Sequence, residues 1–329
     1  MRTVVAAAGI AAALVVSTSA HRLSDWSEAE NLGPAINSAF NDQHPAISND
    51  NLSLYFVSDR PGGAGGTDIW VARRRRVGAA WSTPVPLPAT INTNTAEFAP
   101  TLAADGHALV FGSERSGGCG GRDIWVSLRR NTRDDLGWGP AVNLGCDVNF
   151  SGFDDGPTWF EDRRGRVTLY FTSQNRPGGF GDFDIWASEM NRDGSFGPAY
   201  NVAELNSPAR DTRTAIRRDG LEMLFTSTRP GSLLDVNGNV TLDLWVSTRP
   251  NTHAPWSEPE PAGAMNGAFN DGAPALSEDA EDVYFYSNRP GGFGANDLWV
   301  SHRDMKHGRR DSPGRGHDRR DNGPGHGRR

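Results

Sequence analysis

The 329-residue sequence contains no apolar run long enough to cross a membrane as a helix. Its longest apolar run, residues 4–16, follows Arg2 and precedes the small residues 17–20. This order is typical of a secretory signal peptide, and no cysteine follows that could accept a lipid anchor. We interpret residues 1–20 as a cleaved signal peptide and expect a soluble protein that is periplasmic or secreted.

Positive charge is scarce in most of the chain. The formal net charge is −7, but residues 304–329 carry +4 and Arg2 adds one, which leaves −12 on residues 21–303. Because nucleic acids bind basic surfaces, we expect no nucleic-acid partner. Residues 304–329 are polar and rich in glycine and arginine, so we expect a disordered tail. Its His307, His317 and His326 either bind metal weakly or are simply solvated.

Recognisable catalytic motifs are also missing. The glycine-rich segments do not follow the pattern of a phosphate-binding loop. The histidines of the body occupy different repeat positions, and none stands in a nucleophile motif with serine or cysteine. These residues are His21, His44, His107, His253 and His302.

What the sequence does contain is a motif that returns five times. An aspartate, an isoleucine or leucine, and a tryptophan occur at residues 68–70, 123–125, 184–186, 243–245 and 297–299. A second series keeps the same period: Trp26, Trp81, Trp138, Phe196 and Trp256. A fixed period of this length indicates a repeat architecture.

Each repeat contains four short strand patterns. One of them is apolar at consecutive positions, which suits a strand buried on both faces, as at residues 54–56 and 109–111. Stacked blades bury their strands in this way, so we predict an all-β fold, a single five-bladed β-propeller with four-stranded antiparallel blades. The strand expected at about residues 26–32 would complete blade 5 and close the ring, leaving no long free edge. The propeller would span residues 21–303.

The segment at residues 54–63, followed by Asp68-Ile69-Trp70, resembles the bacterial WD-40-like, TolB-type propeller repeat. The resemblance covers residues 26–303 and recurs five times. It implies an extracytoplasmic propeller used mostly for binding or scaffolding, although such a fold hosts many activities.

The two cysteines, Cys119 and Cys146, fall in loops that a propeller places on one face. Export favours oxidation, so we predict that they form a disulfide. The alternative is two separate thiols whose Cα atoms lie too far apart to bridge.

Five acids occupy one equivalent repeat position, three residues before the start of a strand pattern, and would ring the mouth of the central channel. They are Asp42, Glu97, Asp154, Asp211 and Asp271, with Phe40, Phe98, Phe153 and Phe269 beside four of them. Such a ring can bind a cation or a stacked sugar, or supply catalytic carboxylates. The alternative is structural, because a residue that recurs in every blade more simply accepts hydrogen bonds in every blade.

Serine and arginine also recur before each glycine-rich loop, as at Ser58 and Arg60. We predict an ion pair across that loop, from the arginine to the aspartate of the next strand. In the fourth repeat the loop is longer and places Asp235, Asn237, Asn239 and Asp243 at the spacing of a calcium loop. Calcium is therefore a candidate cofactor, but an Asn-Gly hairpin turn explains the same residues.

The leading functional hypothesis is a non-catalytic, monomeric exported propeller that binds a protein or an envelope glycan through its acidic loop face. The rival is a glycan-cleaving enzyme that uses acids at the channel mouth. The two differ in symmetry: an enzyme should show a deep pocket lined by non-repeated acids such as Asp59, Asp155 or Glu161, whereas a binding module should show a shallow, repetitive face.

Overall fold

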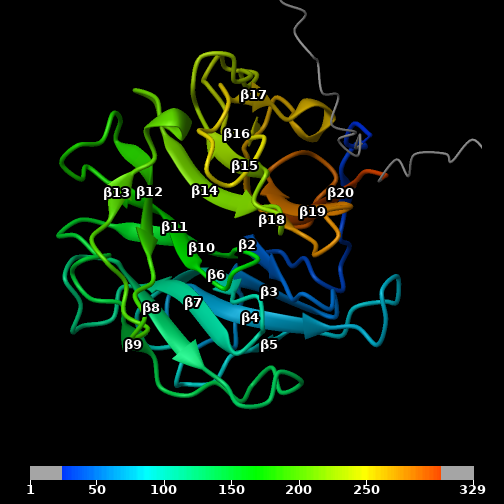
Figure 1. The fold of residues 1–329 in the computed structure, drawn as a ribbon. Helices are drawn as coiled ribbons and strands as arrows, with labels where there is room; N and C mark the ends of the chain where they lie inside the picture. Colours follow the sequence, from blue (N-terminus) through cyan, green and yellow to red (C-terminus); the bar gives the residue numbers. More distant parts are fainter. Residues whose placement is uncertain (1–23, 305–329) are drawn as a thin grey trace, which may run out of the picture. The chain divides into compact units, whose positions relative to one another are not determined.

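Five four-stranded antiparallel sheets surround a central channel in the computed structural model, which describes residues 24–304 (Figure 1). The all-β five-bladed propeller is therefore confirmed. The signal peptide predicted at residues 1–20 and the tail from residue 305 onward lie outside the described residues. Within the described part, no helix is long and apolar enough to span a membrane.

The blades follow the repeats of the sequence, each running from the inner to the outer strand. Blade 1 contains β2 (Asp42–Ile47), β3 (Ser53–Ser58), β4 (Asp68–Arg73) and β5 (Val85–Pro86). Blade 2 contains β6 (Glu97–Leu102), β7 (Ala108–Ser113), β8 (Asp123–Leu128) and β9 (Val142–Asn143). Blade 3 contains β10 (Asp154–Glu161), β11 (Val167–Gln174), β12 (Phe183–Glu189) and β13 (Tyr200–Asn201).

Blade 4 contains β14 (Asp211–Ile216), β15 (Glu222–Ser227), β16 (Asp243–Thr248) and β17 (Glu260–Pro261). Blade 5 contains β18 (Asp271–Leu276), β19 (Asp282–Ser287), β20 (Asp297–His302) and, as its outer strand, β1 (Glu30–Asn31). Two 3-10 turns, η1 (Ala203–Leu205) and η2 (Gly263–Met265), lead into blades 4 and 5.

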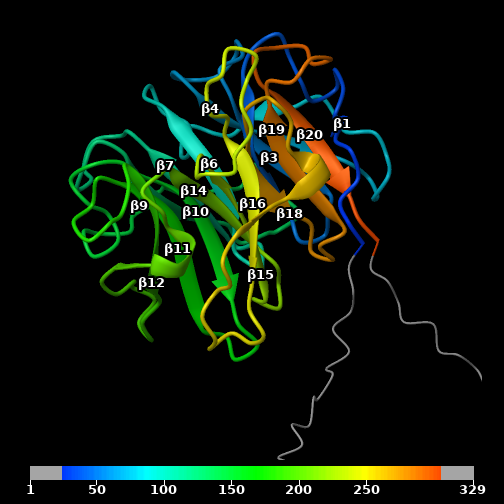
Figure 2. The same ribbon diagram turned by 90° about the horizontal axis from the view of Figure 1, so that it is seen from above.

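The amino-terminal strand closes the ring as predicted. Glu30 pairs with Val300 and Asn31 with Trp299, so β1 lies against β20 (Figure 2). The strand is shorter than expected, but the Ser27 amide donates to the His302 carbonyl and the Leu32 amide to that of Leu298. The pairing therefore extends on both sides of β1 and covers the outer edge of blade 5.

The second strand of each blade forms the core. Every residue of β3, β7 and β15 is buried, as the consecutive apolar pattern predicted. At their centres lie equivalent phenylalanines that are at most 1% exposed: Phe56, Phe111, Phe171, Phe225 and Phe285. The recurring tryptophans of the third strands pack between the blades and are 4–7% exposed. Burial on both faces of these strands is what the stacking of blades requires.

An asparagine fastens each blade to the next. The Asn92 side chain accepts a hydrogen bond from the Ile69 amide at 3.0 Å and donates to the Ile69 carbonyl. Equivalent pairs are Asn149 with Ile124, Asn206 with Ile185, Asn266 with Leu244 and Asn37 with Leu298. The amide thus takes the place of a strand backbone and satisfies the buried peptide groups beyond each short outer strand.

Each inner strand carries a bulge where it faces the channel. The residues there have positive φ angles: His44, Ala99, Gly156, Arg213 and Ala273. Four of the five are not glycine, so the bulge holds them in a conformation that costs free energy. Bulges turn side chains away from the regular alternation of a strand. In this fold they aim one variable residue per blade at the channel.

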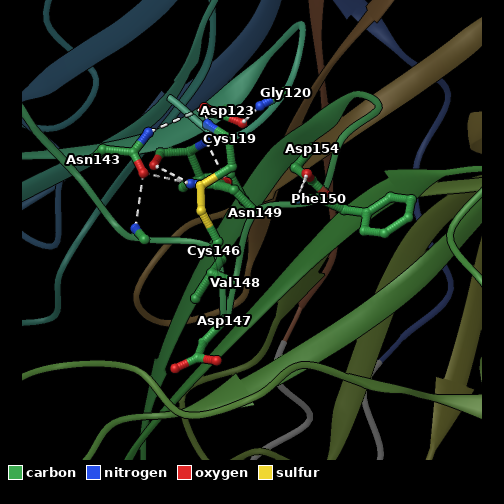
Figure 3. Close-up of a disulfide and its surroundings, with 12 residues drawn as sticks. Cys119, Gly120, Asp123, Asn143, Cys146, Asp147, Val148, Asn149, Phe150 and Asp154 are labelled. Atoms are coloured by element: carbon green, nitrogen blue, oxygen red, sulfur yellow. Dashed lines mark hydrogen bonds between the residues drawn. A yellow bond between two sulfur atoms is a disulfide. The ribbon is translucent and has the colours of Figure 1, made fainter. Parts of the chain in front are cut away.

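The predicted disulfide is confirmed. Cys119 and Cys146 are bonded, with their Cα atoms 5.7 Å apart. Figure 3 shows the bond beside Asp123, whose carboxylate accepts a hydrogen bond from the Gly120 amide. A Cβ on Gly120 would overlap the Phe150 carbonyl, so the β7–β8 loop needs glycine where it meets the entry loop of blade 3.

Candidate functional site

The five equivalent acids begin the inner strands, and their side chains are 0% exposed. Asp211 illustrates their environment. It accepts hydrogen bonds from the amide and hydroxyl of Ser207 at 2.6 and 2.7 Å, and from the Ser227 hydroxyl at 2.6 Å. The Arg229 guanidinium completes the set at 2.6 Å. We call this arrangement the entry clasp, because it fixes the turn into each inner strand.

The entry clasp corrects the predicted ion pair across the glycine-rich loop. Arg60 binds Asp42 at the start of its own blade, not Asp68 of the following strand. Asp68 instead accepts hydrogen bonds from the amides of Ala64 and Gly65 and so holds the loop itself. The same division recurs at Arg115, Arg229 and Arg289, which bind Glu97, Asp211 and Asp271. These buried carboxylates are occupied by donors of their own blades and do not face solvent.

Blade 3 departs from this pattern. An additional residue separates Ser173 from Arg176, and the guanidinium lies 3.7 Å from Asp154. Asp154 accepts a hydrogen bond of 2.5 Å from the Phe150 amide, but within the described residues no well-aligned hydrogen bond joins its other oxygen to the Ser173 hydroxyl. Burial raises the pKa of Asp154 to about 6. The weakest entry clasp therefore immediately precedes the residue that turns into the channel, Asp155.

The four phenylalanines predicted beside the acids have different environments. Phe40 and Phe153 are 42% and 41% exposed, whereas Phe98 and Phe269 are partly covered. Phe98 lies under the Arg122 guanidinium, 3.4 Å from its ring centroid. Phe153 lines the channel mouth, and its backbone bridges to Arg122.

The long loop of blade 4 forms a hairpin. Leu234 pairs with Val240 across an Asn-Gly turn in which Gly238 has a φ of 83°. Asp235 is partly exposed in this turn and accepts hydrogen bonds from the amides of Asn237 and Asn239. Asp243 is buried and accepts from the Leu233 amide. The predicted calcium ligands are thus divided between an exposed turn and a buried strand start, and among the described residues no group of three or more acidic, histidine or cysteine side chains is placed to hold a metal ion.

A pocket of about 460 Å³ opens at the mouth of the channel, off centre towards blades 3 and 4. Its lining differs from blade to blade, because His44, Asp155, Arg213 and Tyr286 come from four different blades. Below it, Pro45, Pro100, Pro157, Thr214 and Pro274 surround a space of only about 30 Å³. A ligand entering from the mouth would therefore stop beside the variable residues at the inner-strand bulges.

Asp155 is the central charged group of this pocket. Its carboxylate accepts hydrogen bonds from Arg213 at 2.8 Å and Arg122 at 2.9 Å, and its side chain is 7% exposed. Burial by itself raises the pKa of Asp155, but the guanidiniums of Arg213 and Arg122 outweigh it and hold that pKa below its usual range. The pocket thus contains a carboxylate that stays ionised although it is buried.

His44 and Tyr286 complete the floor of the pocket. Their rings meet edge to face with centroids 5.7 Å apart. Burial and the nearby Arg213 hold the pKa of His44 well below its usual range, so its ring is neutral at neutral pH. Burial raises the pKa of Tyr286, so its phenol keeps its proton. Both side chains therefore offer neutral hydrogen-bonding groups beside the ionised Asp155.

The rim is built from blades 3 and 4. Asp182 is exposed there and accepts a hydrogen bond from the Gln174 side chain at 3.1 Å. Arg210 stacks on the Phe183 ring, with 4.2 Å between guanidinium carbon and ring centroid. The disulfide joins the loop before Arg122 to the loop before Phe153, so it holds these two lining residues together.

Sequence reasoning named Asp155 only as a marker of the enzyme hypothesis, and Phe153 as a ring residue. It missed Arg122, Arg213, His44 and Tyr286 as site residues. The other two marker acids lie elsewhere: Asp59 binds the Asn41 amide, and Glu161 faces the far end of the channel. Variation between the repeats could have identified these residues. The positions directly after each equivalent acid differ from blade to blade. Residues that serve packing recur in every blade, whereas residues of a binding site can be present in one blade only.

No protein-family model matches this sequence, and no characterised protein matches it in sequence. Several solved structures share the fold. The native arabinanase of Bacillus subtilis aligns with a TM-score of 0.55 and 13% identity, over 82% of this chain and 96% of that chain. An alpha-L-arabinofuranosidase from Lactobacillus brevis aligns at 0.54 and 16%, over 82% and 92%. One from Podospora anserina, in complex with cellotriose, aligns at 0.54 and 12%, over 85% and 96%.

The TolB-type resemblance is supported only as far as the propeller itself. The five four-stranded sheets confirm the propeller, but no family model matches the repeat as TolB-type. The leading hypothesis of a non-catalytic binding module is likewise corrected. The five-bladed proteins aligned above are arabinan- or arabinoside-cleaving enzymes by name, and the channel mouth is a non-repetitive pocket rather than a shallow, repetitive face.

Proposed function

We propose that the protein hydrolyses glycosidic bonds of a glycan bound in the pocket at the channel mouth. The observation that carries the proposal is Asp155, a non-repeated, ionised carboxylate held by Arg122 and Arg213 on the wall of a 460 Å³ pocket. The volume lies in the range of small-molecule sites. The shared architecture of glycan-cleaving five-bladed enzymes supports the proposal at the level of fold.

Glycoside hydrolysis proceeds through a transition state with positive charge on the sugar ring, and most enzymes use two carboxyl groups for it. Asp155 supplies the ionised group, since its two arginine partners keep it deprotonated. It would face the developing positive charge from the pocket wall. Asp182 is the second carboxyl group that lines the pocket, and it is exposed to solvent at the rim. The buried equivalent acids take no part in this arrangement.

The disulfide supports a location in an oxidising compartment. Together with the signal peptide predicted at residues 1–20, it leads us to propose that the protein acts in the periplasm or outside the cell. A glycan partner fits the pocket, whereas a protein partner and a monomeric state stay predictions from the sequence.

The test is release of reducing ends from a panel of neutral and acidic plant and bacterial glycans. We expect wild-type activity on at least one glycan, and losses of about a hundredfold or more in kcat for Asp155→Asn and for Asp182→Asn. Asp105→Asn is the matched control, because Asp105 is an exposed turn residue that does not line the pocket. Thermal unfolding of each variant separates lost chemistry from lost structure. Full activity in Asp155→Asn, or no release from any glycan by folded wild type, would overturn the proposal.

A further inference from the structure

We propose that the glycan bound in this pocket carries an anionic group, a carboxylate or a sulfate, and that Arg210 at the rim binds it. The inference rests on the proposed function, because it names the substrate class of the same site. It is carried by the position of Arg210, by the hydrogen-bonding groups beside it and by the charge of the pocket lining.

Arg210 differs from the other arginines of the pocket. Arg213 binds Asp155, and Arg122 binds both Asp155 and Glu114. Arg210 has no ion pair and no side-chain hydrogen bond within residues 24–304, although its charge sits on the face of Phe183. Stacking on an aromatic ring holds the plane of a guanidinium and leaves its N–H edges available for an oxyanion. Arg210 is therefore an oriented cation whose hydrogen-bond donors are unused.

The backbone holds this cation in place. The Arg210 amide donates to the Thr228 hydroxyl at 3.2 Å, and its carbonyl accepts from the Thr228 amide at 3.1 Å. Arg210 directly precedes β14, and the equivalent residues of the other blades are Asn41, Ala96, Phe153 and Asn270. A charged residue stands at this position only in blade 4. Repeat packing does not require it, which is what a ligand-binding role predicts.

Neutral donors lie beside it in the same lining. Thr212 follows on β14, and Tyr286 presents a phenol with no hydrogen-bond partner among the described residues. A planar carboxylate or a sulfate can accept from a guanidinium and a hydroxyl together. These residues supply both kinds of donor on the side of the pocket nearest blades 4 and 5.

The charge of the lining points in the same direction. Three arginines line the pocket against two aspartates, in a chain whose formal net charge is −7. Because Arg122 and Arg213 pair with carboxylates, Arg210 is the arginine of the lining without a carboxylate partner among the described residues, and such a fixed positive charge attracts anions to this part of the pocket. The sequence predicted an acidic loop face, whereas the lining of this pocket contains more arginines than acids.

Binding calorimetry on the full chain tests the inference with three matched probes. These are an oligogalacturonide, the same oligosaccharide with its carboxylates reduced to alcohols, and a sulfated neutral oligosaccharide. We expect at least one anionic probe to bind about tenfold or more tightly than the reduced probe, with an advantage that shrinks as salt increases. Comparing the carboxylated with the sulfated probe identifies which anion the site prefers.

Variants assign that preference to Arg210. Arg210→Gln should remove the advantage of the anionic probe and change binding of the reduced probe less than twofold, whereas Arg210→Lys should keep part of it. Arg192→Gln is the matched control, since Arg192 is exposed in the β12–β13 turn and does not line the pocket. Equal affinity for all three probes, or an unchanged advantage in Arg210→Gln, would contradict the inference.

The binding assay and the hydrolysis assay can fail separately. Cleavage of a neutral glycan without any preference for anions would overturn this inference and leave the proposed function standing. Binding of an anionic probe through Arg210, with no cleavage of any glycan, would support the inference as a binding site and overturn the proposed activity.

Discussion

In blade 4, Asp211 accepts four hydrogen bonds of 2.6–2.7 Å from Ser207, Ser227 and Arg229, whereas in blade 3 the equivalent Asp154 lies 3.7 Å from Arg176. Blade 3 holds its entry loop by another means, because Cys146 in that loop is bonded to Cys119 of blade 2. In the same blade, Asp155 directly follows Asp154 and lines the pocket. The comparison teaches that the entry clasp is weakest in the blade that supplies Asp155, and that the disulfide holds the entry loop of that blade instead.

The largest expected effect is the difference in stability between variants that lack Asp211 and variants that lack Asp154. Asp211→Ala leaves the Arg229 guanidinium buried without its partner, so we expect a loss of about 3–5 kcal/mol in the free energy of unfolding. Asp154→Ala should cost about 1–2 kcal/mol, since its clasp is incomplete. Urea unfolding followed by tryptophan fluorescence measures both. Equal losses would mean that the weak clasp contributes as much as the complete one.

Removing the disulfide tests what holds the entry loop of blade 3. The two cysteines are 27 residues apart, and a closed loop of that length stabilises by about 3.5 kcal/mol in the chain-entropy account. We expect Cys119→Ser with Cys146→Ser to lose about that much in urea unfolding and to weaken ligand binding, because Arg122 and Phe153 are no longer tethered. Reduced wild type should behave in the same way. Unchanged stability in both would show that the loop is held by its packing alone.

Asp154 also gives the comparison a pH dependence. Its pKa is raised to about 6, from an ordinary value near 3.9. Between these values the folded state binds more protons than the unfolded state, so the stability contributed at this residue falls as pH rises from 4 to 6. Relative to wild type, Asp154→Asn should therefore gain about 2–3 kcal/mol between pH 4 and pH 7. Parallel stability curves for the two proteins, measured by urea unfolding at each pH, would rule this out.

The smallest expected effect concerns the outer aromatic residues. Arg249 lies over the Trp256 ring, with 4.1 Å from guanidinium carbon to ring centroid, and blades 1, 2 and 5 contain equivalent pairs. Blade 3 has Met190 and Phe196 at these positions, and both belong to one hydrophobic cluster. A double-mutant cycle with Arg249→Met and Trp256→Phe should give a coupling energy of about 1 kcal/mol in urea unfolding. A coupling energy near zero would show that the arginine–tryptophan pair contributes no specific interaction beyond what methionine and phenylalanine provide.

The entry clasp shows where sequence reasoning lost accuracy. It recognised that serine and arginine recur together, but it joined Arg60 to Asp68, the nearer acid in the chain. The true partner, Asp42, is 18 residues earlier, and the antiparallel register that pairs Asp42 with Ser58 brings it to the arginine. The error was one of strand pairing, which nearness in sequence does not reveal.

The repeats themselves determined the five blades, the closure by the first strand and the disulfide, because each follows from one periodic pattern and the alternation of strand direction. Only the tertiary structure decided the site. Asp155 meets Arg122 and Arg213 across 33 and 58 residues. Asp155 and Arg213 lie at the inner-strand bulges of blades 3 and 4, and Arg122 lies in the β7–β8 loop of blade 2. A period reports what every blade has in common, and the pocket is made from residues in which the blades differ.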